Sequence, residues 1–229
     1  MTLKLVSSMA TRELLAELLD DWHRQGGFAV QAEAAGGVEV EQRLQAGEVA
    51  DVIVLARPAI ERLGNGGWVR PDSCVDLAHS GIAVAIRAGT PLPAIHDEAA
   101  LRKAVLAART LGYSTGPSGQ YLEQQFERWG ALPQLRARIV VPPPGVPVGR
   151  LVADGTVELG FQQLSELLGL SGVQVVGPLP AGIQHTTIFS GAIGSASSQL
   201  PEAAQLLAFL ASPATEAAKR RLGMDPPDG

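Results

Sequence analysis

Stretches with the pattern of strands alternate with stretches of helical pattern along the whole chain. Residues 51–55 are apolar without interruption after Asp51, which is typical of a strand buried on both faces. Residues 14–22 repeat leucines and a tryptophan at helical spacing. Other strands are expected at 3–7, 28–33, 82–87, 111–114, 137–141, 156–161 and 173–177, and other helices around 40–44, after Pro58, over 97–109, around 122–129, and after Pro201 and Pro213. This alternation predicts an α/β fold of mostly parallel sheets with helices on both faces.

Two passages join strand-like segments without a helix between them. One spans residues 75–89 and the other spans residues 183–196. We interpret them as strands that cross from one lobe to a second and back. The predicted lobes are residues 1–80 plus 192–229, and residues 81–191. The proline-rich segment 141–149 is expected to join a strand to a helix inside the second lobe.

Composition and charge narrow the class of protein. The chain has 229 residues, of which 46% are hydrophobic and 18% charged, as expected for an ordinary globular protein. Its net charge of −5 leaves no basic stripe to neutralise phosphates, so no nucleic-acid partner is expected. The run Lys219-Arg220-Arg221 is predicted to be a solvated helix end near the negative pole of the helix dipole.

Cysteine, histidine and the N-terminal residues bear on compartment and cofactors. Cys74 is the only cysteine, so no internal disulfide is expected, and no apolar run is long enough to span a membrane. The N-terminus enters a strand at once, which predicts a cytoplasmic protein as written, or a periplasmic one if a leader was trimmed. The four histidines are scattered, so we expect neither a metal site nor a cofactor.

Serines and glycines stand where strands give way to helices. Ser7 and Ser8 follow the first strand, Gly36 and Gly37 follow the second, and Ser118 and Gly119 lie in the loop 113–122. Such serines can cap the helix. A helix N-terminus also offers unpaired N–H groups and a positive dipole end, which hold anions. Three such loops in one α/β chain favour a small-anion site.

Two glutamines, a glutamate and a histidine are further candidates. Gln162 and Gln163 end the strand 156–161, either as a polar strand terminus or as amide donors in a ligand cleft beyond the strand ends. His185 lies in the second helix-free passage, where it is either a hinge residue that bonds a backbone carbonyl or a ligand contact and proton carrier. Glu166 is either helix surface or a catalytic base.

The order of these motifs resembles a known family. Ser7-Ser8 stands between a strand and a helix, and Gly36-Gly37 precedes the next helix. Characteristic segments follow at residues 50–54, 118–122 and 159–161. In this order the motifs resemble those of molybdate-binding solute-binding proteins over nearly the whole chain. The resemblance implies a two-lobed periplasmic-binding-protein type II fold with the ligand cleft between the lobes. It also implies an ABC transporter permease as a partner if the protein is exported. The contacts that it implies for a molybdate-like oxyanion are Ser7 or Ser8, Gly36-Gly37, Ser118-Gly119, the helix start at Val148, and Gln162.

Two positions depart from that family, and a nearer branch accounts for one of them. The molybdate-binding proteins have serine hydroxyls where this chain has Gly36-Gly37, and a tyrosine where it has Gln162. The segments SGQYL (118–122), 147–167, VQVVGPLP (173–180) and FSGAI (189–193) are more similar to the aconitate isomerase branch of the superfamily. That resemblance makes Gln162 and Gln163 amide donors to a di- or tricarboxylate.

The aconitate isomerase branch also implies a reaction. An allylic proton shift between cis- and trans-aconitate needs a proton carrier, for which His185 is the first candidate and Glu166 the second. Arg43 and Arg150 are candidate partners for the ligand carboxylates.

The sequence is therefore compatible with three functions. The first is a solute-binding-type protein that closes over a small anion, either an oxyanion or a carboxylate. The second is an aconitate isomerase-like enzyme. The third is a regulatory module whose effector occupies the same cleft.

Overall fold

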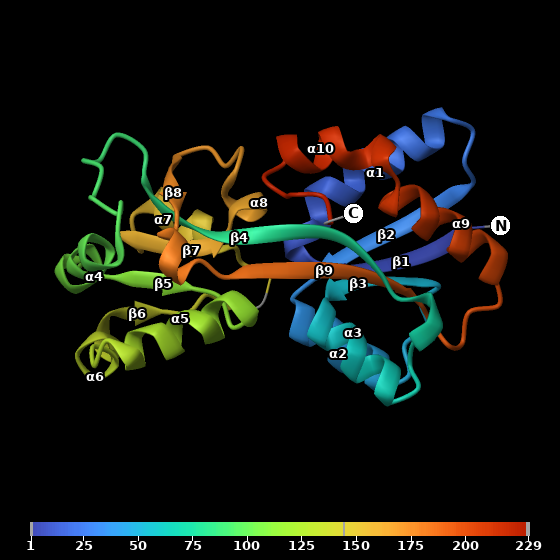
Figure 1. Cartoon of the computed structure of the whole chain (residues 1–229), viewed down its shortest axis with the longest axis horizontal. Coiled ribbons are helices and arrows are strands. Elements are labelled where there is room, and N and C mark those ends of the chain that lie inside the picture. The colour runs from blue at the N-terminus through green and yellow to red at the C-terminus, as the bar shows by residue number, and fades with distance from the viewer. Residues whose placement is uncertain (1, 144, 228–229) are drawn as a thin grey trace. The chain divides into compact units, whose positions relative to one another are not determined.

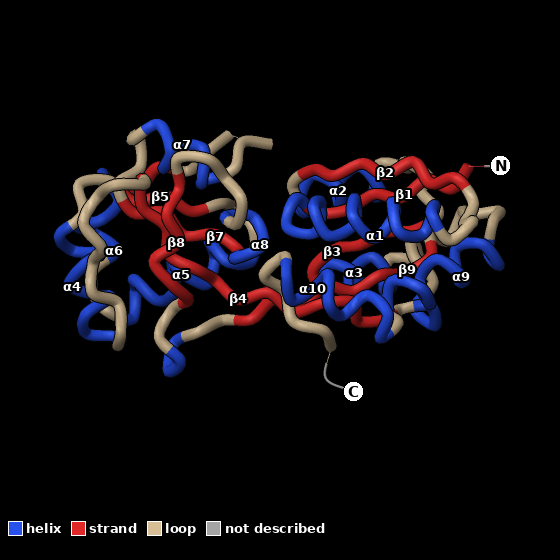
Figure 2. Tube along the Cα trace, turned by 90° about the horizontal axis from the view of Figure 1, so that it is seen from above, coloured by secondary structure: helices blue, strands red, loops and turns tan. Residues whose placement is uncertain are grey.

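The chain folds into two compact units in a computed structural model that describes residues 2–143 and 145–227. Unit 1 consists of Met1–Ser80 and Thr187–Gly229, and unit 2 of Gly81–Thr186. Each unit consists of a β-sheet with helices on both faces (Figures 1 and 2). The fold class is therefore the one that the alternating pattern predicts.

The strands of unit 1 are parallel except for the last. β1 (Thr2–Ser8) pairs in parallel with β2 (Ala29–Ala35) and with β3 (Val52–Ala56). β9 (Thr186–Ile193) pairs antiparallel with β3, from Val52↔Ile193 to Ala56↔Phe189. The chain therefore returns to unit 1 after Thr186, the first residue of β9, and not after residue 191, the boundary predicted from the sequence.

Helices cover both faces of the unit 1 sheet (Figure 1). On one face, apolar side chains of α1 (Arg12–Arg24), α9 (Leu200–Ala211) and α10 (Glu216–Arg221) form a core with the strands. On the other face, α2 (Gly37–Gln45) and α3 (Arg57–Asn65) form a second core. The short 3-10 helices are Met9–Thr11, Pro71–Ser73 and Pro213–Thr215.

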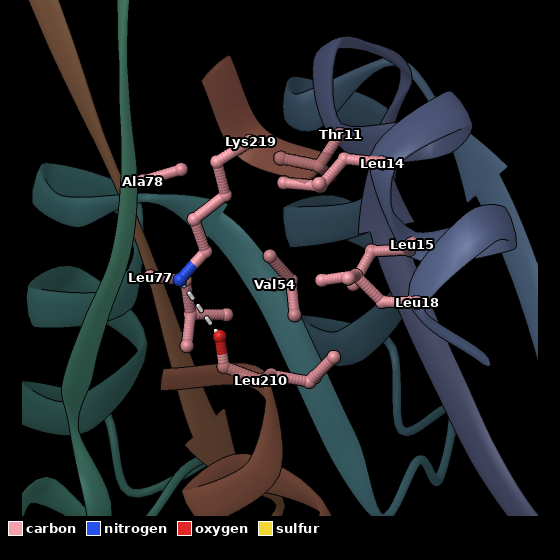
Figure 3. A pocket seen from close by; sticks show the side chains of 9 residues that line it. All are labelled: Thr11, Leu14, Leu15, Leu18, Val54, Leu77, Ala78, Leu210 and Lys219. Carbon is pink, nitrogen blue, oxygen red and sulfur yellow. Dashed lines mark hydrogen bonds between the residues drawn. The ribbon is translucent and has the colours of Figure 1, made fainter. Parts of the chain in front are cut away.

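Lys219 is fully buried in unit 1, which differs from the solvated helix end that its basic run predicts. Its Nζ donates a 2.9 Å hydrogen bond to the Leu210 carbonyl beside a cavity of about 10 Å³ (Figure 3). Burial among leucines lowers the pKa of Lys219 to about 8. The expectation is wrong for Lys219 because that face of α10 packs against the core, whereas Arg220 and Arg221 pair with Glu216 and Glu17.

Unit 2 has a parallel centre with antiparallel neighbours. β5 (Leu111–Tyr113) pairs in parallel with β6 (Ile139–Val140) and with β7 (Leu159–Gln163). β4 (Val75–Arg87) begins in unit 1, and its second half pairs antiparallel with β7 and with β8 (Val173–Pro178). The passage 75–89 thus contains one continuous strand that runs from unit 1 into unit 2.

The helices of unit 2 also cover both faces of their sheet. α4 (Glu98–Ala107), α5 (Pro117–Arg128) and α6 (Leu132–Leu135) enclose the larger core, which includes Phe126 and Phe161. α7 (Val148–Asp154) and α8 (Leu164–Leu167) contribute to two smaller cores. The 3-10 helices of this unit are Arg136–Arg138 and Ala181–Ile183. Within the described residues, no helix is both long and apolar enough to cross a bilayer.

Candidate functional site

In unit 1 the carboxyl ends of three parallel strands lie at one edge of the sheet. Ser8, the last residue of β1, is in register with Ala35, the last residue of β2, and Ser7 is in register with Val54 of β3. A helix follows each strand within a few residues, so N–H groups and positive dipole ends gather at this edge. This is the arrangement in which open α/β sheets bind small ligands.

The hydroxyl of Ser8 is buried at this edge and does not cap a helix. Ser8 is 7% exposed, and its Oγ makes no hydrogen bond to any residue in the part of the chain that the structure describes. Thr11, the N-cap residue of α1, makes no side-chain capping bond either, and its Oγ1 donates to the Ser8 carbonyl at 3.1 Å. Ser7 Oγ makes only a long 3.5 Å contact with the Glu33 carbonyl. A buried hydroxyl without a partner is costly, which marks Ser8 as a candidate ligand contact.

Gly36 and Gly37 begin α2 beside Ser8. Gly36 is the N-cap residue, and no side chain caps this helix. A Cβ built on Gly37 would lie 3.9 Å from Ser8 Cβ, so these two expected contacts are neighbours in the fold. The absence of a side chain at both glycines leaves the first N–H groups of α2 open to a small ligand.

Arg43, a candidate carboxylate partner, is already bound by glutamates of unit 1. Its guanidinium donates to Glu33 at 2.6 Å and to Glu48 at 2.6 and 2.8 Å. Arg43 and Lys4 together lower the pKa of Glu48 to about 2. The charge of Arg43 is therefore neutralised within this ion-pair network, which argues against a role in ligand binding.

In unit 2 the carboxyl ends of β5 and β7 lie in register, with Tyr113 opposite Phe161, and β7 runs two residues further to Gln163. α5 begins after β5, and its second residue, Ser118, is 3% exposed. A Cβ on Gly119 would lie 1.7 Å from the Ser114 carbonyl oxygen, so this position requires glycine for the turn into α5. The glycine at position 119 is therefore explained by backbone packing, without a ligand contact.

Gln162 and Gln163 are buried at the end of β7, with 2% and 4% exposure. The Gln162 Oε1 accepts from the backbone N–H of Gly149 at 3.2 Å, and its Nε2 donates to Glu166 Oε1 at 2.8 Å. Gly149 follows Val148, the first residue of α7, so Gln162 satisfies an N–H of the helix start that was expected to bind the anion. The Nε2 group of Gln162 has two N–H donors, and the bond to Glu166 uses one of them.

His185 is half-buried and held by an aromatic ring. It stacks on Tyr121, with ring centroids 4.6 Å apart and an angle of 16° between the rings. The Tyr121 hydroxyl donates to the Ile183 carbonyl at 2.8 Å. Burial lowers the pKa of His185, so the imidazole is neutral at pH 7 and able to accept a proton.

The expected residues thus form one group in each unit. Ser7, Ser8, Gly36 and Gly37 come together in unit 1, and Gln162, Glu166 and the start of α7 come together in unit 2. The role of Tyr121 could not be read from the sequence alone. Tyr121 lies on α5, three residues after Ser118, and the available signal was an aromatic residue among the polar residues 114–121. Among the described residues, no cluster of histidine, cysteine, aspartate or glutamate is arranged to hold a metal ion.

Comparisons with known proteins agree with this architecture. An aconitate isomerase from a Pseudomonas species is 36% identical over 234 residues, which cover 98% of this chain and 88% of that protein. The periplasmic molybdate-binding protein of Azotobacter vinelandii superposes with a TM-score of 0.82 at 23% identity, covering 99% of this chain and 100% of that one. A sulfate-binding protein from Mycobacterium tuberculosis superposes with a TM-score of 0.80 at 17% identity, covering 99% and 87%.

The family itself is shown by sequence. The family model for bacterial extracellular solute-binding proteins matches residues 3–225, nearly the whole chain. The two solved structures share its fold at identities too low to transfer a ligand. The chain belongs to the family of bacterial extracellular solute-binding proteins.

Proposed function

We propose that this solute-binding protein binds a small anion, either an oxyanion or a carboxylate, at the strand ends of unit 1. The observation that carries the proposal is the buried Ser8 hydroxyl, which makes no hydrogen bond to the described residues and lies beside the open N-terminus of α2. Neutral donors and helix dipoles suit an anion because they supply N–H and O–H groups without a buried charge. The molybdate- and sulfate-binding proteins of the same fold support the proposal.

Replacement of Ser8 tests this proposal. Ser8→Ala removes one hydrogen bond to a charged ligand, so the affinity should fall roughly tenfold to a hundredfold. Calorimetric titration with molybdate, sulfate and cis-aconitate measures the change, and Ser198→Ala, at an exposed serine of unit 1, is the matched control. Unchanged affinity in Ser8→Ala would remove Ser8 as a contact, and a wild-type protein that binds none of these anions would refute the proposal.

A second candidate function is isomerisation of aconitate. It is favoured by the 36% identity to an aconitate isomerase and by the neutral, ring-stacked His185. In an allylic proton shift a base removes a proton from one carbon, the double bond moves, and an acid returns a proton to another carbon. A neutral imidazole can perform both steps in turn.

Proton NMR of cis-aconitate incubated with the protein tests this second candidate. Signals of trans-aconitate should grow with the wild-type protein, and His185→Ala should slow their growth by at least about a hundredfold. His96→Ala, at an exposed histidine of unit 2, should retain the wild-type rate. Cis-aconitate signals that broaden without any product would identify a binding protein instead.

If the protein serves transport, the proposed anion binding implies a protein partner. A solute-binding protein that is exported would deliver its ligand to the permease of an ABC transporter, and stimulation of the transporter's ATPase by the loaded protein is the measurement for that step.

A further inference from the structure

Gly36 and Gly37, at the start of α2, are not required by the fold. Neither adopts a left-handed φ, and a Cβ built on either residue would lie 3.9 Å from its nearest packing partner. Elsewhere the fold does require glycine, because a Cβ at Gly160 or Gly191 would lie 2.4 or 2.5 Å from a side chain. Glycine also weakens a helix relative to alanine. The two glycines of α2 therefore point to a use other than packing.

The two glycines lie beside N–H and O–H donors at one edge of unit 1. The Val40 N–H donates to the Gly36 carbonyl at 2.9 Å in the first bond of α2, so the N–H groups of residues 37–39 point out of the helix end. Ser8 lies on the same face of β1 as Val6, which packs in the core with α2. The buried Ser8 hydroxyl therefore faces this helix.

Apolar side chains stand next to these donors. Val38, the second residue of α2, is 46% exposed. A Cβ on Gly37 would lie 3.9 Å from Leu55 Cδ2 and 3.9 Å from Ser8 Cβ, so glycine leaves a space of about one methyl group between them. Apolar groups of this kind can contact carbon atoms of a ligand, but they offer no hydrogen bond to its oxygen atoms.

The charge at the start of α2 also bears on the ligand. The first turn of this helix carries one charged residue, the acidic Glu39. Sulfate and molybdate hold two negative charges on one compact group, so the Glu39 carboxylate repels them more strongly than it repels a single charge. A carboxylate group holds one charge on two oxygens, which the Ser8 hydroxyl and two N–H groups can satisfy. Its carbon atoms can then lie against the apolar side chains.

We propose that the unit 1 site binds a carboxylate group of a small organic acid, and that Gly36 and Gly37 are specificity-determining residues that leave room for its carbon atoms beside Ser8. The inference rests on the proposed anion binding and narrows its ligand to carboxylates. It sets stability against binding, because alanine at either position strengthens the helix and stands between the ligand and Ser8.

Calorimetric titration with succinate, cis-aconitate, sulfate and molybdate tests the inference. The wild-type protein should bind at least one of the two organic acids at least roughly tenfold more tightly than either oxyanion. Gly37→Ala should weaken binding of that acid by at least roughly tenfold, while its urea midpoint stays at or above the wild-type value. The matched control is Gly64→Ala, in α3 of the same unit, where a Cβ would lie 3.5 Å from Pro71. It should keep the wild-type affinity.

Failure of the inference and failure of the proposed function give different results. Equal or tighter binding of sulfate or molybdate would overturn the carboxylate class and leave anion binding in place. Unchanged carboxylate affinity in Gly37→Ala would overturn the role of the glycines. If that variant does not fold, Gly36→Ala, at the N-cap, carries the same test with the same expected loss. A wild-type protein that binds none of the four probes would overturn the proposed function itself.

Discussion

At the scale of single residues, the side-chain amide of Gln184 substitutes for a backbone segment beside β4. Its Oε1 accepts from the Ile82 N–H at 3.1 Å, and its Nε2 donates to the Ile82 carbonyl at 3.0 Å. Glycine at position 81 makes room for it, because a Cβ there would lie 3.0 Å from Nε2. Gln184→Ala should therefore lower the free energy of unfolding by about 1–2 kcal/mol, since His185 and Leu179 also bond Ile82.

Urea denaturation of the wild-type protein and of Gln184→Ala measures this loss. Gln124→Ala, at an exposed glutamine on α5, is the control and should leave the midpoint unchanged. Equal midpoints for both variants would mean that the paired bonds to Ile82 add nothing to stability.

Residue types and their positions at strand ends were predictable from sequence, but their partners were not. Ser8 and Gly37 could be named because each stands where a strand pattern gives way to a helical pattern. That Gln162 bonds Gly149 and Glu166 depends on side-chain torsions and on the close approach of α7, and no local pattern encodes these. The buried Lys219 was missed for a related reason, because a run of three basic residues resembles a solvated helix end whichever face packs inward.

At the scale of elements, the spacing of hydrophobic residues predicts the strands and helices well. It predicts less well whether two strand-like segments form one continuous strand. The helix expected over residues 97–109 is α4, which begins after Asp97, where the Asp97 carboxylate accepts from the Ala100 N–H at 2.7 Å. The passage 75–89 looked like two strand-like segments because His79, Ser80 and Gly81 interrupt the apolar pattern. It forms the single strand β4 because backbone pairing continues through residues whose side chains do not signal a strand.

At the scale of the whole molecule, the α/β fold class could be predicted because strand and helix alternate, and the family because its motifs extend over nearly the whole chain. The identity of the ligand could not be predicted in the same way. Neutral donors such as Ser8 and the N–H groups of α2 fit oxyanions and carboxylates alike, and the two departures at Gly36-Gly37 and Gln162 remove hydroxyls without adding a charge.

The stability of the folded chain should depend on alkaline pH through Lys219. Its pKa is about 8 in the folded protein and about 10.5 in the unfolded chain, so between these values the unfolded chain binds more protons. Below pH 8 the lysine is protonated in both states, and the folded protein bears the full cost of burying the charge. The free energy of unfolding attributable to Lys219 should thus rise as the pH rises from 8 to 10.5, by about 3 kcal/mol at most.

Urea denaturation across this pH range, with Lys219→Met for comparison, measures the effect. The Leu210 carbonyl keeps a 3.1 Å hydrogen bond from Thr215 Oγ1 in that variant, so removal of the amine leaves no unpaired carbonyl. Lys219→Met should be more stable than the wild-type protein near pH 7, and its advantage should shrink toward pH 10.5, whereas Lys103→Met, at an exposed lysine, should follow the wild-type curve. Parallel curves for Lys219→Met and the wild-type protein would mean that the buried amine keeps its ordinary pKa, because only a shifted pKa makes the difference depend on pH.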